Sequence, residues 1–432
     1  MWHHFMGGSA WPQGNGDDIV RLKRLLIAGA AAALAAMPAS AGELSFWHAY
    51  AGQQDKVEFI DFALGEFAKA HPEVKLEVVA AEQSAYKTKL NTAMASGNPP
   101  DVFYTLPGGF LNAFVKGGQM YALDEELARD GWRDSFLESA ISQTSKDGHT
   151  YAVPVDVDSV VFWYDKARFA ENGWTVPKTY EELLALAEKV KGEGLVPFSL
   201  GNKDSWPATF WFQYLEMRLK GSGVVSAFVN GDPDATLGAE AMEKLAELAK
   251  QEYFPIGFNG MSDQEANMLF LNGQAAMMLN GTWQIGASAD APEGFELGYF
   301  AFPAVAGGAG DQSDVLAGVA ASFGVSQKAE NKADAVTLLK FLTSREVMTK
   351  YVELRKTMVT VKDATTETAA GPVLYDISNK LMKAAGHLDP FYDTAMPPAA
   401  TNIYYTSLQG VLDGSLPPAD AAKRIEDALR AK

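Results

Sequence analysis

Glu43-Leu-Ser-Phe-Trp47 begins a run of alternating strand and helix patterns that determines the fold class. Val74-Lys-Leu-Glu-Val78 and Asp101-Val-Phe-Tyr104 are the next two strand-like segments. Between them, residues 55–71 and 84–96 carry apolar side chains at helical spacing. Strand, helix, strand, helix, strand within roughly sixty residues predicts a parallel α/β sheet. Such sheets bind ligands in the loops at the carboxyl ends of their strands.

A second α/β unit is predicted farther along the chain. Thr179-Tyr-Glu-Glu182 and Ser262-Asp-Gln-Glu265 are capping boxes, each of which opens a helix. The apolar run 274–279 ends at Asn280-Gly281-Thr282-Trp283. Nowhere in the sequence is there a linker long enough to separate two independent domains, so we expect the two units to share chain crossings.

Composition excludes several classes of function. The chain has 432 residues, a formal net charge of −18, no cysteine and six histidines. The acidic charge argues against nucleic acid or an anionic membrane as the main partner. Without cysteine there is no thiol nucleophile, iron–sulfur cluster or disulfide, and after residue 41 the histidines lack metal-ligand spacing. We therefore expect no metal and no cofactor.

The N-terminal 41 residues have the pattern of an export signal. Basic residues at 21–24 precede an apolar run over 25–36 and the small residues Ala39-Ser40-Ala41. The run is too short to cross a bilayer of roughly 30 Å, which makes a retained anchor the weaker interpretation. Residues 1–20 fit no targeting pattern, and a start codon assigned too early would explain them. Cleavage before Gly42 predicts a periplasmic protein.

Four groups of segments, taken in order, resemble the carbohydrate-binding family of extracellular solute-binding proteins of ABC importers, which includes maltose-binding protein. No single segment is specific, but the ordered set is. The groups are Phe59–Pro72 with Val74–Val78; Tyr86–Leu90 with Gly97–Val102; Tyr151–Pro154, Trp163–Lys166 and Pro177–Leu183; and Phe270–Met277 with Asn280–Trp283.

The resemblance implies a type II fold of two lobes, each a sheet flanked by helices, joined by three hinge crossings. By analogy, residues 42–154 plus 302–350 form the first lobe and residues 155–301 plus 351–432 the second. The crossings are then expected near Val153–Asp158, Tyr299–Pro303 and Ser344–Leu354. The resemblance also implies a monomer that delivers its ligand to the transmembrane subunits of a permease.

A sugar presents hydroxyls to carboxylates and amides, and apolar C–H faces to flat aromatic rings. Trp283 follows a glycine turn in a loop, so it belongs to no helical face, and its position matches the stacking tryptophan of the family. Trp206 precedes a proline, and we weigh a ligand role and a core role for it equally. Trp211 is expected to pack inside a helix.

Asp158 is the strongest acidic candidate, because it interrupts a run that would otherwise be a buried strand. A carboxylate buried there is costly unless something pairs with it, which favours a ligand role over a solvated strand end. Asp156 would share its face if the segment is extended.

Arg355 has two interpretations. If its side chain points into the cleft, it would bind a phosphate, sulfonate or uronate with two hydrogen bonds. If it lies on a helix surface, it is solvated, and we favour this second interpretation. Weaker candidates, which follow predicted strands or match the family in position, are His48, Tyr50, Gln83, Gly318 and Tyr404, the last in competition with Tyr405.

We predict a binding protein, not an enzyme, that captures a sugar or oligosaccharide in the periplasm. An alternative keeps the fold and changes the ligand to an anionic sugar derivative or glycerol 3-phosphate. A secreted glycoside hydrolase with two catalytic carboxylates is a third hypothesis, but no Asp or Glu pair stands out with supporting motifs.

Overall fold

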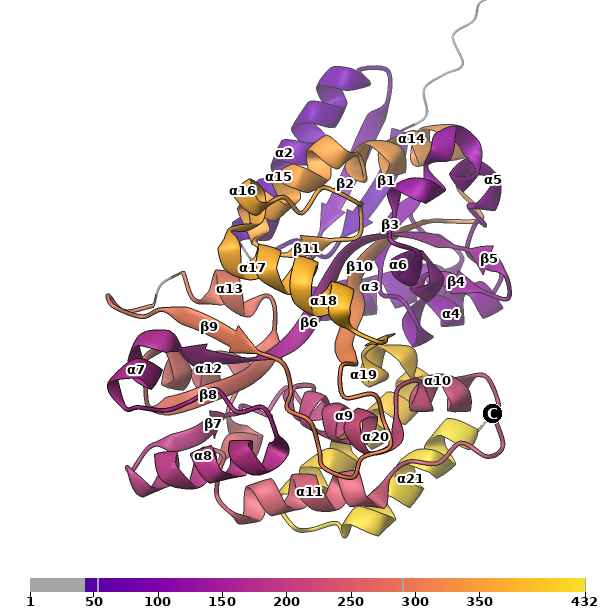
Figure 1. Cartoon of the computed structure of the whole chain (residues 1–432). Coiled ribbons are helices and arrows are strands. Elements are labelled where there is room, and N and C mark those ends of the chain that lie inside the picture. The colour runs from indigo at the N-terminus through magenta and orange to yellow at the C-terminus, as the bar shows by residue number, and fades with distance from the viewer. Residues whose placement is uncertain (1–42, 53, 290, 432) are drawn as a thin grey trace, which may run out of the picture.

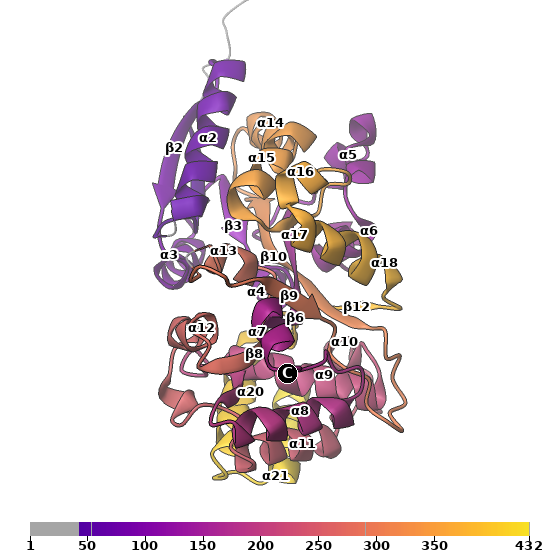
Figure 2. The same cartoon turned by 60° about the vertical axis from the view of Figure 1, so that its left-hand side comes forward.

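The computed structural model describes residues 43–52, 54–289 and 291–431, so the predicted signal peptide, residues 1–41, lies outside the described residues. Two lobes, one above the other in Figure 1, are joined by the long strands β6 (Ala152–Asp165) and β10 (Val315–Val325). The view in Figure 2 shows the same two lobes from another side. This is the predicted two-lobe arrangement.

The first lobe contains the alternating pattern with which the sequence begins. Strand β1 pairs in parallel with both β2 and β3, as predicted. The elements of this lobe are β1 (Glu43–His48), α2 (Gln54–Ala70), β2 (Lys75–Ala80), α3 (Gln83–Ser96), β3 (Val102–Thr105), α4 (Gly109–Lys116), α5 (Asp124–Leu127), α6 (Glu138–Gln143), β4 (Ser145–Lys146), β5 (His149–Thr150), α14 (Lys332–Leu342), α15 (Arg345–Arg355), β11 (Met358–Val359), α16 (Glu367–Ala370) and α17 (Pro372–Asp376).

The second lobe contains both predicted capping boxes. The Thr179 and Ser262 side chains each accept a hydrogen bond from the backbone N–H three residues on, and α8 and α12 begin there. The elements are α7 (Lys166–Glu171), α8 (Tyr180–Gly192), β7 (Val196–Ser199), α9 (Pro207–Lys220), α10 (Val224–Val229), α11 (Ala239–Lys250), α12 (Asp263–Leu271), β8 (Ala275–Gly281), α13 (Gln284–Ala287), β9 (Leu297–Phe300), β12 (Leu388–Asp389), α19 (Tyr392–Ala395), α20 (Pro398–Leu412) and α21 (Pro418–Arg430). Helix α18 (Met382–Ala384) lies on the connection between the lobes.

One sheet path runs through both lobes in the order β2-β1-β3-β10-β6-β8-β7. The first half of β6 pairs with β10, and its second half pairs with β8 and β9. Strand β10 is antiparallel to β6, with Gly318 opposite Asp158, and its register is irregular between Val319 and Ser322. The lobes are therefore joined by a continuous two-stranded ribbon. No helix in the described ranges is long and apolar enough to cross a membrane.

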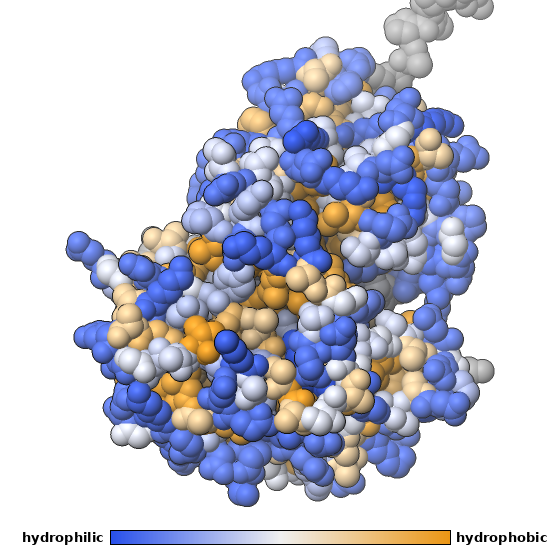
Figure 3. Space-filling model, in the orientation of Figure 1, coloured by the Kyte–Doolittle hydropathy of each residue, from blue (hydrophilic) through white to orange (hydrophobic). Residues whose placement is uncertain are grey.

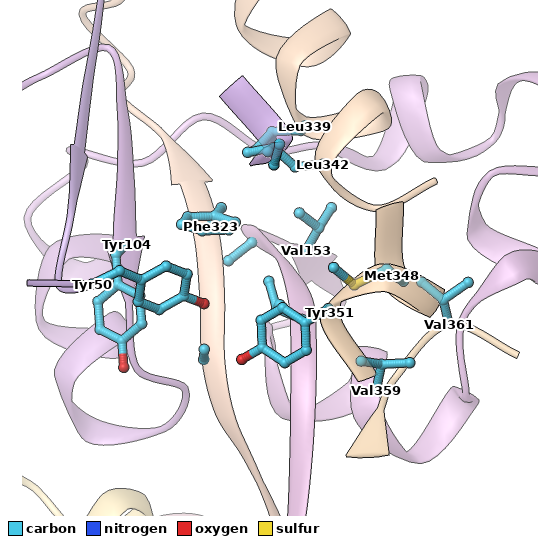
Figure 4. Close-up of a cluster of buried hydrophobic side chains, with 14 of the residues drawn as sticks. Tyr50, Tyr104, Val153, Phe323, Leu339, Leu342, Met348, Tyr351, Val359 and Val361 are labelled. Atoms are coloured by element: carbon cyan, nitrogen blue, oxygen red, sulfur yellow. The ribbon is translucent and has the colours of Figure 1, made fainter. Parts of the chain in front are cut away.

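The buried side chains form two hydrophobic cores, and the first also includes Phe270, Leu271 and Met278 from α12 and β8. Figure 4 shows part of the first core, where Phe323 of β10 lies among side chains from β6, α14 and α15. Phe302 and Val305 belong to the second core, whereas Tyr351 and Leu374 belong to the first.

The first expected crossing, near Val153–Asp158, lies within β6, but the other two crossings differ from those expected. The chain passes through β6, through β10, and then between Ile377 of the first core and Phe391 of the second. Near the second expected crossing, Phe300 and Phe302 belong to the second core, while Tyr299 packs against the first core and donates a hydrogen bond to Asp376. The third expected crossing, near Ser344–Leu354, lies inside the first lobe. The physical reason is that β10 and α15 each pack against the first core on a face that local sequence pattern does not identify.

Candidate functional site

Asp156 and Asp158 lie on β6 at the junction of the lobes. The strand is extended there, so the two carboxylates point to the same face, as expected for residues two apart. Their exposed fractions are only 3% and 5%. Two buried acids on one strand face repel each other unless neighbours compensate them.

Asp158 is held from the second lobe. The Thr282 hydroxyl, which follows β8, donates a hydrogen bond of 2.7 Å to Asp158 Oδ1. Burial and the nearby charge of Asp156 raise the pKa of Asp158 to about 7, while the Thr282 hydrogen bond and the positive charge of Arg355 oppose the rise. Among the described residues, Oδ2 has no hydrogen-bond partner. This oxygen is available to a ligand.

Arg355 is neither a solvated surface residue nor a free anion clamp. Its Nε lies 3.0 Å from Asp55 Oδ2 and its Nη1 lies 3.1 Å from Asp156 Oδ2. The Tyr351 hydroxyl also bonds to Asp156, and the guanidinium lies over the Tyr351 ring. The Arg355 guanidinium is therefore already paired with two carboxylates, which leaves few of its N–H groups free to bind an external phosphate.

Lys56, near the N-terminus of α2, brings a second cation to this cluster. Among the described residues its ammonium makes no hydrogen bond or ion pair, and it lies 6.0 Å from the centre of the Tyr50 ring. Burial and Arg355 lower the pKa of Lys56, and the charges of Asp156, Asp55 and Asp158 oppose that shift. The cluster thus has an unpaired donor as well as an unpaired acceptor.

Trp283 directly follows Thr282, the hydrogen-bond partner of Asp158, in the chain. Its ring covers Gly281, where a Cβ would come within 2.1 Å of the indole, so any larger residue at that position would displace the ring. The Trp206 ring lies 5.7 Å from Trp283 in an edge-to-face arrangement, and Phe210 lies 6.0 Å away. Phe391 continues the row, 5.7 Å from Phe210. Trp206 and Trp283 are both only partly buried, which leaves ring surface for a ligand.

His48 and Tyr50 lie behind this site, not on its surface. Both side chains are 2% exposed. Burial lowers the pKa of His48 to about 4, so the ring is neutral at pH 7, and its Nδ1 accepts a hydrogen bond from the Tyr50 backbone N–H. The Tyr50 hydroxyl is buried without a hydrogen-bond partner in the described part of the chain.

The remaining predicted residues are scattered. Gly318 is buried under Phe391, which lies within 2.8 Å of where a Cβ would be, so the glycine admits an aromatic ring. Gln83 is exposed at the start of α3. Tyr404 is completely buried in the second core, where its hydroxyl faces the Thr209 carbonyl. Tyr405 is the partly exposed member of the pair and donates a hydrogen bond to Asp393.

A family model for bacterial extracellular solute-binding proteins matches residues 42–349. The chain belongs to this family.

Relatives and solved structures agree with this assignment. An uncharacterised ABC transporter extracellular-binding protein of Pyrococcus horikoshii is 29% identical over 56% of each chain, so the chain spans little more than half of that relative. A probable sugar-binding periplasmic protein of Mesorhizobium japonicum is 26% identical over 94% of this chain and all of its own. A structure from work on xylan utilization by Caldanaerobius polysaccharolyticus has a TM-score of 0.79 and 25% identity, over 89% of this chain and 99% of its own.

Sequence reasoning missed three polar residues at the junction of this solute-binding protein. They are Lys56, Thr282 and Asp263, whose carboxylate accepts a hydrogen bond from the Asn280 amide and whose pKa burial raises to about 6. The sequence positions of Lys56 and Thr282 could have identified them. Lys56 follows Asp55 at the start of the helix after the first strand, and Thr282 lies in the same turn as Trp283.

Two surface cavities of this solute-binding protein are lined by neither Asp158 nor Trp283. One, of about 540 Å³, is in the first lobe beside Trp132 and Lys340. The other, of about 500 Å³, lies between β9 and α17 and includes Phe295 and Leu297. Figure 3 shows apolar residues on the surface between the two lobes. Within the described residues, no three His, Cys, Asp or Glu side chains are arranged to hold a metal ion.

Proposed function

We propose that this protein captures a neutral sugar or short oligosaccharide between its lobes and delivers it to the permease of an ABC importer. The single observation that carries the proposal is the hydrogen bond between the buried Asp158 carboxylate and the Thr282 hydroxyl, which ties that carboxylate to the turn that holds Trp283. An indole face covers the C–H face of a pyranose, and a carboxylate accepts from its hydroxyls. Relatives described as sugar-binding periplasmic proteins support this ligand class.

A neutral ligand is favoured over an anionic one by the charges at the junction. Three carboxylates, Asp55, Asp156 and Asp158, face two cations, Arg355 and Lys56. Arg355 is already shared by two of the acids. A phosphate or uronate would meet carboxylates that already hold Arg355, whereas a hydroxyl meets the unpaired oxygen of Asp158.

We also propose that the protein acts as a periplasmic monomer, exported through a cleaved signal peptide, and binds its ligand without chemical change. A ligand shifts the lobes toward closure only if it binds the closed form more tightly than the open form. The permease would then recognise the closed form. N-terminal sequencing of the exported protein tests the cleavage site before Gly42.

A thermal-shift screen tests the ligand class. We expect a mono-, di- or trisaccharide to raise the melting temperature in a concentration-dependent way, because it binds only the folded state. Sugar phosphates and sulfonates are expected to have no effect. Stabilisation by the anionic compounds alone would contradict the neutral-sugar assignment. Incubation with the same glycosides tests for hydrolysis, and turnover would overturn the binding-protein proposal.

A further inference from the structure

The lobes meet again away from the ribbon, where the N-terminus of α4 faces α19. Helix α19 belongs to the second lobe, since its flanking residues Phe391 and Met396 are part of the second core. A Cβ on Gly108 would come within 2.3 Å of the Thr394 carbonyl oxygen, and one on Gly109 within 2.0 Å of the Met396 carbonyl oxygen. Backbone of one lobe therefore lies directly against backbone of the other.

The two glycines differ in why they must be glycine. Gly108 has a φ of +71°, a conformation that L side chains rarely adopt. Gly109 has no such backbone requirement, since its φ lies outside the left-handed region. Among the atoms around it, the first that a Cβ would meet belong to the second lobe, at Met396 and Pro397. Glycine is thus required at position 109 by the contact between the lobes and not by the backbone conformation of the first lobe.

Opposite charges flank this contact. Lys87 of α3 is half-buried, and burial lowers the pKa of its ammonium against the raising effect of the Asp393 carboxylate on α19. The Tyr405 hydroxyl donates a hydrogen bond of 2.7 Å to Asp393 and fixes that carboxylate within the second lobe. The attraction between Lys87 and Asp393 therefore acts across the two lobes.

We propose that the arrangement of the lobes in this structure is the closed one and that Gly109 is its closing contact: it requires the backbone at residue 109 to lie against the Met396 carbonyl, which only glycine permits. The open arrangement tolerates any small residue there. This inference deepens the proposed function, because closure is how the ligand is held, but its test uses no ligand, so the two proposals fail separately.

The test measures the distance between lobes in the ligand-free protein. The chain has no cysteine, so Glu73→Cys in the first lobe and Glu243→Cys in the second give two unique sites for spin labels on exposed positions. We expect Gly109→Ala to lower the ratio of closed to open molecules by about five- to a hundredfold, the range expected for overpacking by a methyl group. Double electron–electron resonance reads this as loss of the shorter distance.

Gly65→Ala is the matched control. Gly65 lies in α2 of the same lobe, and a Cβ there meets nothing within 4 Å. A distance distribution for Gly109→Ala equal to that of Gly65→Ala overturns the proposal. So does a Gly109→Ala protein that fails to fold by circular dichroism, because the methyl group would then clash within the first lobe.

A charge reversal tests the same contact without changing packing. Lys87→Glu places two carboxylates across the contact and is expected to lower the closed-to-open ratio. Lys116→Glu makes the same change on the exposed side of α4 and is expected to leave the ratio unchanged. Equal distributions for these two variants would contradict a lobe contact at this position.

Discussion

Trp283 is partly exposed, its ring packs against Trp206 and Phe210, and the residue before it is bonded to the Asp158 carboxylate. We expect Trp283→Ala to weaken ligand binding by about 30- to 100-fold, because about 2–3 kcal/mol of apolar contact with the ligand is lost. The melting temperature of the empty protein should change little, since the ring is only partly covered. Isothermal titration calorimetry with the sugar found in the screen measures the first effect.

Trp47→Ala is the control for loss of an indole. Trp47 is also partly buried, but it lies on β1 beneath Lys89. We expect this variant to bind the sugar as the wild type does. If Trp283→Ala instead lowers the melting temperature strongly and keeps its affinity, Trp283 is a core residue.

Asp158 makes stability depend on pH. Its folded-state pKa of about 7 lies above the value of about 3.9 for an unfolded chain, so the folded state holds more protons between those values. The contribution of Asp158 to stability therefore falls as the pH rises through this window. Asp158→Asn removes this effect while keeping a partner for Thr282. Its melting temperature relative to wild type is expected to be higher at pH 8 than at pH 5.

Asp61→Asn controls for the loss of one carboxylate, because Asp61 is exposed on α2. A difference between Asp158→Asn and wild type that is the same at both pH values would mean that the Asp158 proton is not linked to folding.

At the level of single residues, the sequence allowed us to predict those site residues that a short segment of chain identifies. The interruption of an apolar strand drew attention to Asp158, and the glycine turn drew attention to Trp283; both lie at the lobe junction. Tyr404 and Arg355 could not be placed in this way. A helix pattern does not tell which of two adjacent tyrosines enters the core, nor that Asp55, 300 residues earlier, pairs with Arg355.

At the level of elements, helix α8 depends on its first turn. Thr179 and Glu182 form a reciprocal capping box there. We expect Thr179→Ala to lower the free energy of unfolding by about 1 kcal/mol, measured by urea denaturation, without changing sugar affinity. Thr337→Ala is the control, because the Thr337 hydroxyl bonds only to a carbonyl within α14. Equal losses in the two variants would rule out the cap as the cause.

The elements themselves were largely predictable, because periodicity and caps are local. The strands and helices between residues 43 and 105 follow the predicted pattern closely. The crossings were less predictable, since β6 and β10 belong to both lobes at once. In a continuous apolar strand, the sequence does not indicate the residue at which the strand leaves one core and enters the other.

At the level of the whole molecule, the ribbon couples the two lobes. Because β6 pairs with β10 in one lobe and with β8 in the other, neither lobe can unfold without disturbing a strand of its neighbour. We expect differential scanning calorimetry to show one transition, with equal van't Hoff and calorimetric enthalpies. Two resolved peaks would show that the ribbon does not couple the lobes.

The alternation of the chain between lobes also sets when folding can finish. The first core needs residues as late as Ile377, and the second needs Leu429, close to the C-terminus. A chain truncated before Ile377 therefore lacks part of both cores. Such non-local pairing slows folding. The same chain order that joins the two lobes thus delays the native state.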